Sequence, residues 1–369
     1  MKHRARKSIF DVNVYVPGRP VDEVKRELGI NSVVKLASNE NPYGPSPEVV
    51  RAISKESRYV NRYPDGSCYY LRKMLASHLH VGEGQLIFGN GSDELIVMAV
   101  RAFVEASDEV IISYPSFLIY EIASKCEGAR IKRIPLVDFS YDLDAMLKAI
   151  TKRTKIVFVG NPDNPSGQYL TQLEAEKFLD GIPEDVLVFF DEAYYEYITA
   201  RDYVKTIRLL KKYRNLLITR TFSKMYGLAG LRIGYGIASE EIVDLLNRVR
   251  QPFNVNSIAQ AAAIACLQDK QYYAEVARKI KEQRLFLYKG LKSIGADFVK
   301  GYANFILIDT KNDSSTITAE LLKRGVIVRD MKFCGMDTFI RVTIGTEKEN
   351  RRFLSVFGRV YRENNNGRG

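Results

Sequence analysis

Four near-continuous apolar runs constrain the fold of this chain most strongly. They occupy residues 155–160, 186–190, 216–219 and 233–237. Strands that are buried on both faces of a parallel sheet have this continuous apolar character. Segments with helical spacing of apolar residues lie between them, at residues 172–179, 204–213 and 240–249. The alternation predicts an α/β domain with a mostly parallel central sheet.

The pattern extends upstream and changes downstream. Residues 85–88 and 109–113 are further expected strands, and helices are expected from Ser92 and over residues 117–125. After Pro252 the spacing predicts one long helix over 257–293, strands at 298–310, 326–329 and 339–344, and helices at 316–323 and 347–361. We therefore expect an N-terminal segment (1–40) packed on a small lobe, a large domain (41–255) and a smaller α+β C-terminal domain (256–369).

Composition narrows the functional classes. The chain has 369 residues and a net charge of +11, from 55 basic and 44 acidic side chains. The basic residues are spread among acidic ones, which favours a solvated surface or attraction of anionic substrates over nucleic-acid binding. Four distant cysteines without a C-x-x-C motif argue against a zinc site and fit a reducing cytoplasm. We expect a cytoplasmic protein without a signal peptide, a membrane span, a metal or a nucleic-acid partner.

Polar motifs follow the expected strands, where a doubly wound sheet binds its ligands. In Gly89–Asp93, glycines allow a tight turn and the free amides of a helix start face an anion. A plain helix cap explains this motif equally well. In Tyr114–Phe117 an aromatic ring could stack on a planar cofactor or simply fill the core.

Two further motifs supply an amide and a carboxylate. Asn161–Gly167 is ordinary turn chemistry, or it presents an Asn side chain to a ring oxygen. Asp191–Tyr194 follows a buried strand, and a carboxylate there needs a partner. A pyridinium nitrogen would be one, because the ion pair keeps it protonated and lets the ring accept electrons. A metal-binding acid is the rival interpretation, without a second ligand cluster to support it.

The last motif is Thr221–Lys224, followed by Arg232. A lysine after a strand is usually a solvated charge. Partial burial near Arg232 would lower its pKa, and the neutral amine could attack a carbonyl cofactor and shuttle a proton. The flanking hydroxyls and the arginine suit a phosphate. Together these features favour pyridoxal phosphate.

In this order the five motifs resemble the fold-type I pyridoxal-phosphate aminotransferases, and within them the histidinol-phosphate aminotransferase family. The resemblance covers nearly the full chain. It also includes residues 15–18, 35–42, 61–66, 250–256 and 341–345. The chain departs from the family pattern at Asp163, where Asn is common, and at Phe333–Gly335, where many relatives have an aromatic-Tyr-Gly run.

The resemblance implies how the cofactor is held. Lys224 would form the Schiff base and move a proton between substrate and cofactor, and Asp191 would pair with the pyridine nitrogen. Asn164 and Tyr194 would hold the ring oxygen, and Phe117 would stack on the ring. The residues expected at the phosphate are Gly91, Ser92, Asp93, Thr221, Ser223 and Arg232, with Tyr63 reaching the phosphate of a neighbouring subunit. The last assignment implies a homodimer with shared sites.

The resemblance also implies the reaction. Arg341 would clamp the carboxylate of glutamate or 2-oxoglutarate, and Tyr15, Asn41 and Arg329 would contact substrate. The expected activity is transamination of L-histidinol phosphate with 2-oxoglutarate, giving imidazole-acetol phosphate and glutamate in histidine biosynthesis. The alternatives are an aromatic or broad-range aminotransferase, a decarboxylase of an amino-acid phosphate, and a basic nucleic-acid regulator. The last is disfavoured because residues before 35 leave no room for a DNA-binding segment.

Overall fold

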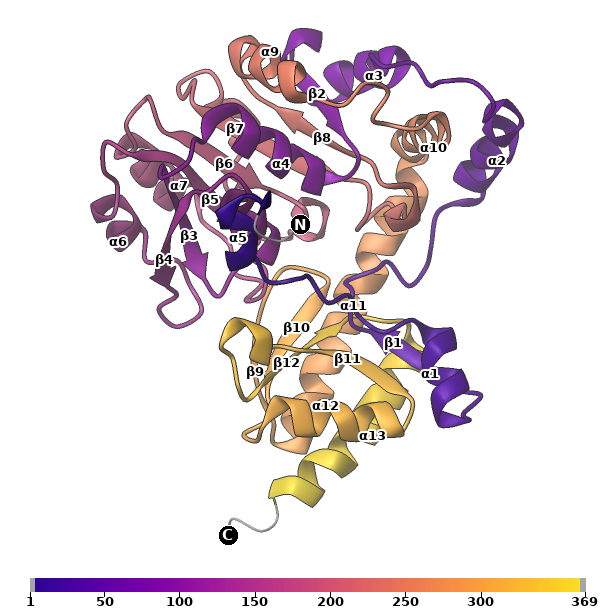
Figure 1. Cartoon of the computed structure of the whole chain (residues 1–369). Helices are drawn as coiled ribbons and strands as arrows, with labels where there is room; N and C mark the ends of the chain where they lie inside the picture. The colour runs from indigo at the N-terminus through magenta and orange to yellow at the C-terminus, as the bar shows by residue number, and fades with distance from the viewer. Residues whose placement is uncertain (1–3, 366–369) are drawn as a thin grey trace.

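Two β-sheets organise the computed structural model, which describes residues 4–365 (Figure 1). The larger sheet has seven strands in the order β2-β8-β7-β6-β5-β3-β4. Their bounds are β2 Leu86–Gly89, β3 Glu109–Tyr114, β4 Arg130–Pro135, β5 Thr154–Gly160, β6 Leu187–Asp191, β7 Leu216–Thr221 and β8 Gly234–Ile237. Only β8 is antiparallel to its neighbours, so β2 and the five strands from β7 to β4 end at one edge. The start of β8 lies at that edge too.

Alternate residues of these strands face two apolar layers. Ile156 and Phe158 pack with α4, α5 and α9, whereas Val157 and Val159 pack with the helices of the opposite face. The helices of this domain are α2 Pro47–Glu56, α3 Tyr69–Leu79, α4 Ser92–Phe103, α5 Leu118–Cys126, α6 Leu143–Lys148, α7 Gln172–Asp180, α8 Thr206–Leu209, α9 Glu240–Val249 and α10 Ser257–Gln268. Burial on both faces explains why the strand sequences are continuously apolar.

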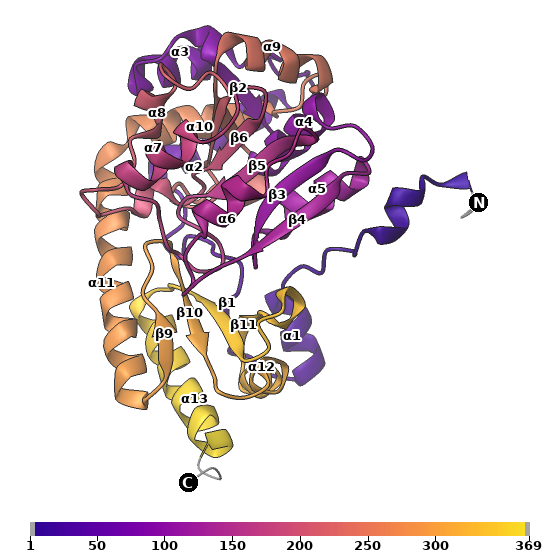
Figure 2. The same cartoon turned by 90° about the vertical axis from the view of Figure 1, so that its left-hand side faces the viewer.

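The second sheet has five strands in the order β1-β11-β12-β10-β9. Their bounds are β1 Val34–Leu36, β9 Asp297–Val299, β10 Phe305–Asp309, β11 Val326–Asp330 and β12 Phe339–Thr343. The helices α1 Val21–Leu28, α11 Lys270–Ile294, α12 Ser314–Lys323 and α13 Glu347–Asn365 accompany it. Helix α11 has 25 residues, about 37 Å of helix, and runs alongside both sheets (Figure 2).

The N-terminal segment divides between the two lobes. Strand β1 pairs in parallel with β11, and Val24 of α1 packs against Ile327. A 3-10 helix at Lys7–Asp11 instead lies against α5 of the large lobe, where Lys125 Nζ donates to the Asp11 carbonyl over 3.2 Å. The segment therefore packs on the small lobe along only part of its length, contrary to the expectation for residues 1–40.

Three expected elements are broken by specific contacts. The long helix is interrupted at Asp269, whose carboxylate accepts from Tyr272 N and caps α11. The strand expected over 298–310 is split because Tyr302 N donates to the Gly167 carbonyl over 2.8 Å and draws the chain into a loop. The helix expected over 204–213 is only α8, since the chain turns after Leu209 toward β7.

Candidate active site

Thirteen of the sequence-predicted residues line two adjoining cavities at the edge where the parallel strands end, and Gly91 lies in the turn beside them. One cavity, of about 180 Å³, extends from Ser92 and Arg232 to Asp191 and Lys224. The other, of about 110 Å³, continues to Arg329 and Arg341 of the small lobe. Tyr15, Phe117, Asn164, Tyr194 and Lys224 line both. The site is therefore a single cleft between the two lobes.

The phosphate end is built from two close backbone approaches. Helix α4 begins at Ser92 after Gly91, which has a φ of 82°. A Cβ on Gly91 would lie 2.5 Å from Arg232 Nη2, and one on Gly234 would lie 2.7 Å from the Ser92 amide. Only glycine at both positions lets the arginine and the amides of the helix start converge, and such a start attracts anions.

Side chains complete this end. Arg232 precedes the antiparallel strand β8, so it reaches the edge where β7 ends. Its Nη1 donates to Ser223 Oγ over 3.3 Å, and its Nη2 lies 3.2 Å from Asp93 Oδ2. Thr221 Oγ1 accepts from the Ser223 amide over 3.1 Å and fixes that turn. A guanidinium, a hydroxyl and helix-start amides thus surround one small volume, as a phosphate requires.

Lys224 places its amine at the junction of the two cavities. The Nζ atom donates to the Ser38 carbonyl over 3.4 Å and lies 5.7 Å from the centre of the Tyr194 ring. Burial, together with the positive charge of Arg341, lowers the pKa of Lys224 to about 8. About one-tenth of this amine is neutral at pH 7, against about one in 3,000 at its ordinary pKa.

Asp191 is a buried carboxylate at the end of β6. Burial raises its pKa to about 6, and hydrogen bonds to the charged form oppose that rise. The donors are the Tyr120 hydroxyl at 2.8 Å, the Thr219 hydroxyl at 3.3 Å and the Ala193 amide at 3.2 Å. Within residues 4–365 no cation forms an ion pair with it, so the carboxylate is poised for one from a ligand.

Asn164 and Tyr194 follow the neighbouring parallel strands β5 and β6. The Tyr194 hydroxyl accepts from Asn39 Nδ2 over 2.9 Å, and burial raises its pKa to about 12. Asn164 Oδ1 accepts from Arg341 Nη1, which leaves the Asn164 amide hydrogens to donate elsewhere. Phe117 is the N-cap residue of α5 and packs edge-on against Tyr120, with ring centres 5.5 Å apart.

Arg341 brings a cation from the small lobe into the cleft. It lies on β12 and also donates from Nη2 to the Ala37 carbonyl over 3.3 Å. Its Nε atom is buried without a hydrogen-bond partner within the described chain. An unpaired buried guanidinium N–H is costly, and burial lowers the pKa of Arg341. A ligand carboxylate would accept a hydrogen bond from the unpaired Nε–H and would stabilise the charged guanidinium.

Arg329 and Tyr15 form the outer wall. The guanidinium of Arg329 lies 4.5 Å from the ring centre of Phe333 and 5.7 Å from that of Tyr15. Its Nη1 donates to the Val16 carbonyl over 3.0 Å, which ties the N-terminal segment across the mouth. The departure at Phe333–Gly335 therefore changes the wall beside Arg329.

The structure does not bring two predicted residues into the cleft. The Asn41 side chain donates to the Met225 carbonyl over 2.7 Å and accepts from the Tyr43 amide over 2.9 Å, so both its groups serve the backbone. Tyr63 is 84% exposed and stacks on Phe253 with ring centres 4.8 Å apart. It lies outside its own chain's cavities.

Two residues absent from the predicted set contact the site directly. Tyr120 donates to Asp191, and Asn39 donates to Tyr194. Tyr120 is one helical turn after Phe117, a spacing that places both on one face of α5. Asn39 lies inside the 35–42 motif, two residues before the asparagine that was chosen instead.

These residues fit pyridoxal phosphate. The group needs a lysine amine for its aldehyde, a carboxylate for its pyridinium nitrogen and an anion site for its phosphate. Lys224, Asp191 and the Arg232–Ser92 end supply them on neighbouring strand ends. Within residues 4–365 no group of three or more His, Cys, Asp or Glu side chains could hold a metal, and no helix is long and apolar enough to cross a membrane.

A half-buried lysine that shares one cavity with a buried carboxylate and a phosphate cradle, on a fold-type I scaffold, is the arrangement of a pyridoxal-phosphate-type enzyme. Residues 31–357 match the model of the family described as "Aminotransferase class I and II". The chain belongs to this family, which confirms the predictions of the fold and of an aminotransferase.

Similar proteins agree with that family. A histidinol-phosphate aminotransferase from Moorella thermoacetica is 46% identical over 358 residues, 97% of this chain and 93% of the relative. One from Geobacillus sp. is 45% identical over 349 residues, 95% of this chain and 96% of the relative. The solved histidinol-phosphate aminotransferase from Sinorhizobium meliloti in complex with pyridoxal-5′-phosphate has a TM-score of 0.91 and 28% identity, and the match covers 98% of each chain.

Proposed function

We propose that this chain is a pyridoxal-phosphate-dependent aminotransferase that converts L-histidinol phosphate and 2-oxoglutarate to imidazole-acetol phosphate and glutamate, a step of histidine biosynthesis. The observation that carries the proposal is that Lys224 and Arg341 line the same cavity. A lysine with a lowered pKa lies in one cleft with an arginine whose Nε is unpaired. The names of relatives up to 46% identical support the substrate.

When bound, the cofactor supplies an aldehyde that carries the amino group and a ring that accepts an electron pair from the substrate α-carbon. We assign its phosphate to Ser92, Asp93, Ser223 and Arg232, with Thr221 and the Gly91 turn holding them in place. Phe117 covers one face of the ring, and Asn164 with Tyr194 binds the ring oxygen. Asp191 carries the negative charge for the pyridinium.

Lys224 is the proton carrier in this proposal. Its amine is the only lysine amine among the residues that line the two cavities. With a pKa of about 8, the amine can accept the proton from the substrate α-carbon near neutral pH. It can then donate that proton to the cofactor. The Ser38 carbonyl accepts from Nζ over 3.4 Å and orients the amine.

Substrates are held by the small lobe and the N-terminal segment. Arg341 is positioned for a bidentate bond to the carboxylate of glutamate or 2-oxoglutarate. Arg329, with Tyr15 beside it, is the cation available for the phosphate of histidinol phosphate at the mouth. Asn41 is retained only as a support of the Met225 backbone.

We also propose a cytoplasmic homodimer with shared sites and a lobe boundary near residue 40. We place the second boundary after α10 rather than at residue 255, because α10 packs on α2 and α3 of the large lobe. Exposed apolar side chains gather along residues 50–70, including Tyr59, Val60, Tyr63 and Tyr70. Such a patch suits a protein interface. A second copy would bring Tyr63 to the phosphate end of the neighbouring cleft. The change of sheet between β8 and β9 supports the second boundary.

The test is to incubate purified enzyme, loaded with cofactor, with histidinol phosphate and 2-oxoglutarate and to measure glutamate. Phenylalanine and tyrosine serve as competing donors. Glutamate formed with a kcat/KM at least tenfold higher for histidinol phosphate supports the proposal. Comparable turnover of the aromatic amino acids would favour the broad-range alternative. Release of carbon dioxide from a phosphorylated amino acid, without formation of glutamate, would show that the enzyme is a decarboxylase instead.

A further inference from the structure

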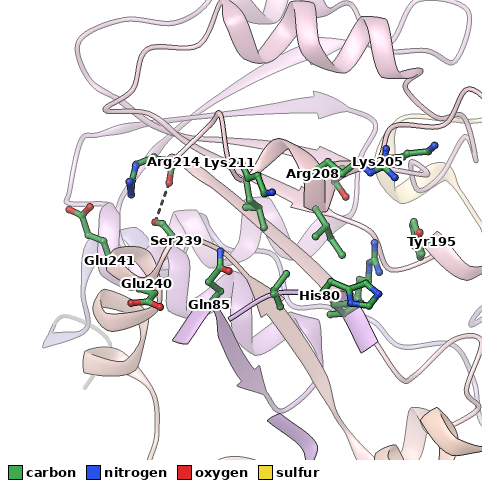
Figure 3. A pocket seen from close by; sticks show the side chains of 16 residues that line it. His80, Gln85, Tyr195, Lys205, Arg208, Lys211, Arg214, Ser239, Glu240 and Glu241 are labelled. Carbon is green, nitrogen blue, oxygen red and sulfur yellow. Dashed lines mark hydrogen bonds between the residues drawn. The ribbon is translucent and has the colours of Figure 1, made fainter. Parts of the chain in front are cut away.

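A cavity of about 820 Å³ lies away from the cleft (Figure 3). The end of α3, the helix α8 with its following turn, and the start of α9 line it. It shares no lining residue with either cavity of the candidate active site. Cavities of about 300–1,000 Å³ hold small ligands, so the volume is sufficient for one.

Uncompensated positive charge borders this cavity. Lys205, Arg208 and Lys211 recur every third residue along α8 and its turn, and Arg214 follows. Figure 3 shows these four along one side of the cavity and Glu240 and Glu241 at one end. Within residues 4–365 neither the four cations nor the two glutamates form an ion pair. The net charge of the side chains around this cavity is therefore positive, and it is concentrated at the end distant from the two glutamates.

The remaining walls combine apolar and aromatic side chains with the polar side chains of Gln85, Thr206 and Ser239. Leu79 ends α3, Val81 follows that helix, and Ile207 comes from α8. The ring of Tyr195 is half-buried, and one face carries the guanidinium of Arg220 at 3.5 Å. Arg220 itself is neutralised by Glu192 at 2.8 Å. The cavity thus combines an anion-attracting rim with surface for a ring.

We propose that this cavity is a second, non-catalytic binding site for a phosphate ester with an aromatic body, of the size of a nucleoside diphosphate. Lys205, Arg208 and Lys211 bind the phosphates, the two lysines as point charges and Arg208 through its planar fork. The aromatic body packs on Leu79, Val81 and Ile207.

The test is calorimetric titration of the cofactor-loaded enzyme with ADP as the probe. The informative variant is Arg208→Ala/Lys211→Ala. The matched control is Lys152→Ala/Arg153→Ala, which removes the same charge from two exposed residues outside the cavity. All four positions are exposed, and circular dichroism with thermal melting verifies folding of both variants. Separate titrations with pyrophosphate and adenosine resolve the two parts of the ligand.

We expect saturable ADP binding whose Kd rises at least tenfold in the cavity variant and less than twofold in the control. Pyrophosphate is expected to bind more weakly than ADP, and adenosine more weakly still. Absence of saturable binding overturns the proposal. So does an equal loss in both variants, which would indicate general attraction to a basic surface, or unchanged binding in both, which would place ADP elsewhere.

Discussion

Replacing Tyr120 by phenylalanine removes one hydrogen-bond donor from Asp191 and leaves an aromatic ring in place. The Tyr120 hydroxyl donates to Asp191 Oδ2 over 2.8 Å, and its ring stacks on Phe158 with centres 4.6 Å apart. Phenylalanine keeps the stacking. The change therefore isolates the contribution of one buried hydroxyl to the charge of a buried carboxylate.

The magnitude follows from the bond that is lost. A hydrogen bond to a charged group contributes about 1.5–3 kcal/mol, and 1.36 kcal/mol changes a pKa by one. Without this donor the pKa of Asp191, about 6 in the native chain, should rise to roughly 7 or 8. At a pKa of 7, the charged fraction at pH 7 falls from about 90% to about 50%.

The direction of this change in the pKa of Asp191 determines the measurement that tests it. Because the charged carboxylate is the form that pairs with a pyridinium, raising the pKa of Asp191 in the apoenzyme moves the acid-side loss of cofactor affinity to higher pH. We expect the acid limb of the pH profile of cofactor binding by the Tyr120→Phe apoenzyme to lie about one pH unit above that of the native apoenzyme. Cofactor binding above pH 9 should differ little, because Asp191 is ionised in both proteins there.

Tyr141→Phe is the matched control. Tyr141 is also a tyrosine that donates to a carboxylate, but its partner at 3.0 Å is Asp163, which follows β5, whereas Asp191 ends β6. Its acid limb should stay in place. If the two variants show the same profile, or if Tyr120→Phe keeps the native limb, then the Tyr120 bond does not control the ionisation of Asp191.

Four further predictions concern the cleft and the dimer. The rate at which apoenzyme captures pyridoxal phosphate should rise with pH and level off above about 8, the pKa of Lys224, because the neutral amine is the reacting form; a flat profile by stopped-flow absorbance would contradict this. Lys224→Ala should lower kcat by about 10²- to 10⁴-fold while still retaining cofactor after gel filtration, and near-native turnover would refute its role as proton carrier. Arg341→Gln should raise the KM for 2-oxoglutarate by about 100-fold, since losing one partner of a buried charge pair costs about 2–5 kcal/mol, whereas Arg329→Gln should raise mainly the KM for histidinol phosphate. Tyr63→Phe should weaken cofactor retention in a dimeric enzyme, and an active monomer in analytical ultracentrifugation would rule out the shared site.

The parts of the site that the sequence predicts are those next to regular strands. Asp191 and Thr221 end β6 and β7, and Ser92 starts the helix after β2. Parallel strands end at one edge, so the positions of these residues along the chain already imply proximity. To predict that Arg232 lies at this edge, one must also know that β8 is antiparallel and begins there.

Residues whose neighbours come from distant segments could not be chosen in the same way. Asn39 and Asn41 occupy one short motif and have the same side chain, yet only Asn39 reaches Tyr194. The choice depends on Asn39 having a φ of 55°, with its amide donating to Thr343 Oγ1 over 2.9 Å. That contact spans 304 positions, and no local spacing encodes it.

The junction of the lobes explains why cofactor chemistry is easier to predict than substrate choice. Asp191, Ser92 and Lys224 belong to the large sheet or the turns after its strands, and one scaffold fixes their relation. Arg341 and Arg329 belong to β12 and β11 of the other sheet, and they meet the first group only because Arg341 bonds Asn164 and Arg329 bonds the Val16 carbonyl. Each of these contacts joins a substrate-side cation to a segment outside its own lobe's regular structure. A change in loop length or wall, as at Phe333–Gly335, can therefore move the substrate cations while the lysine, the carboxylate and the phosphate cradle keep their positions.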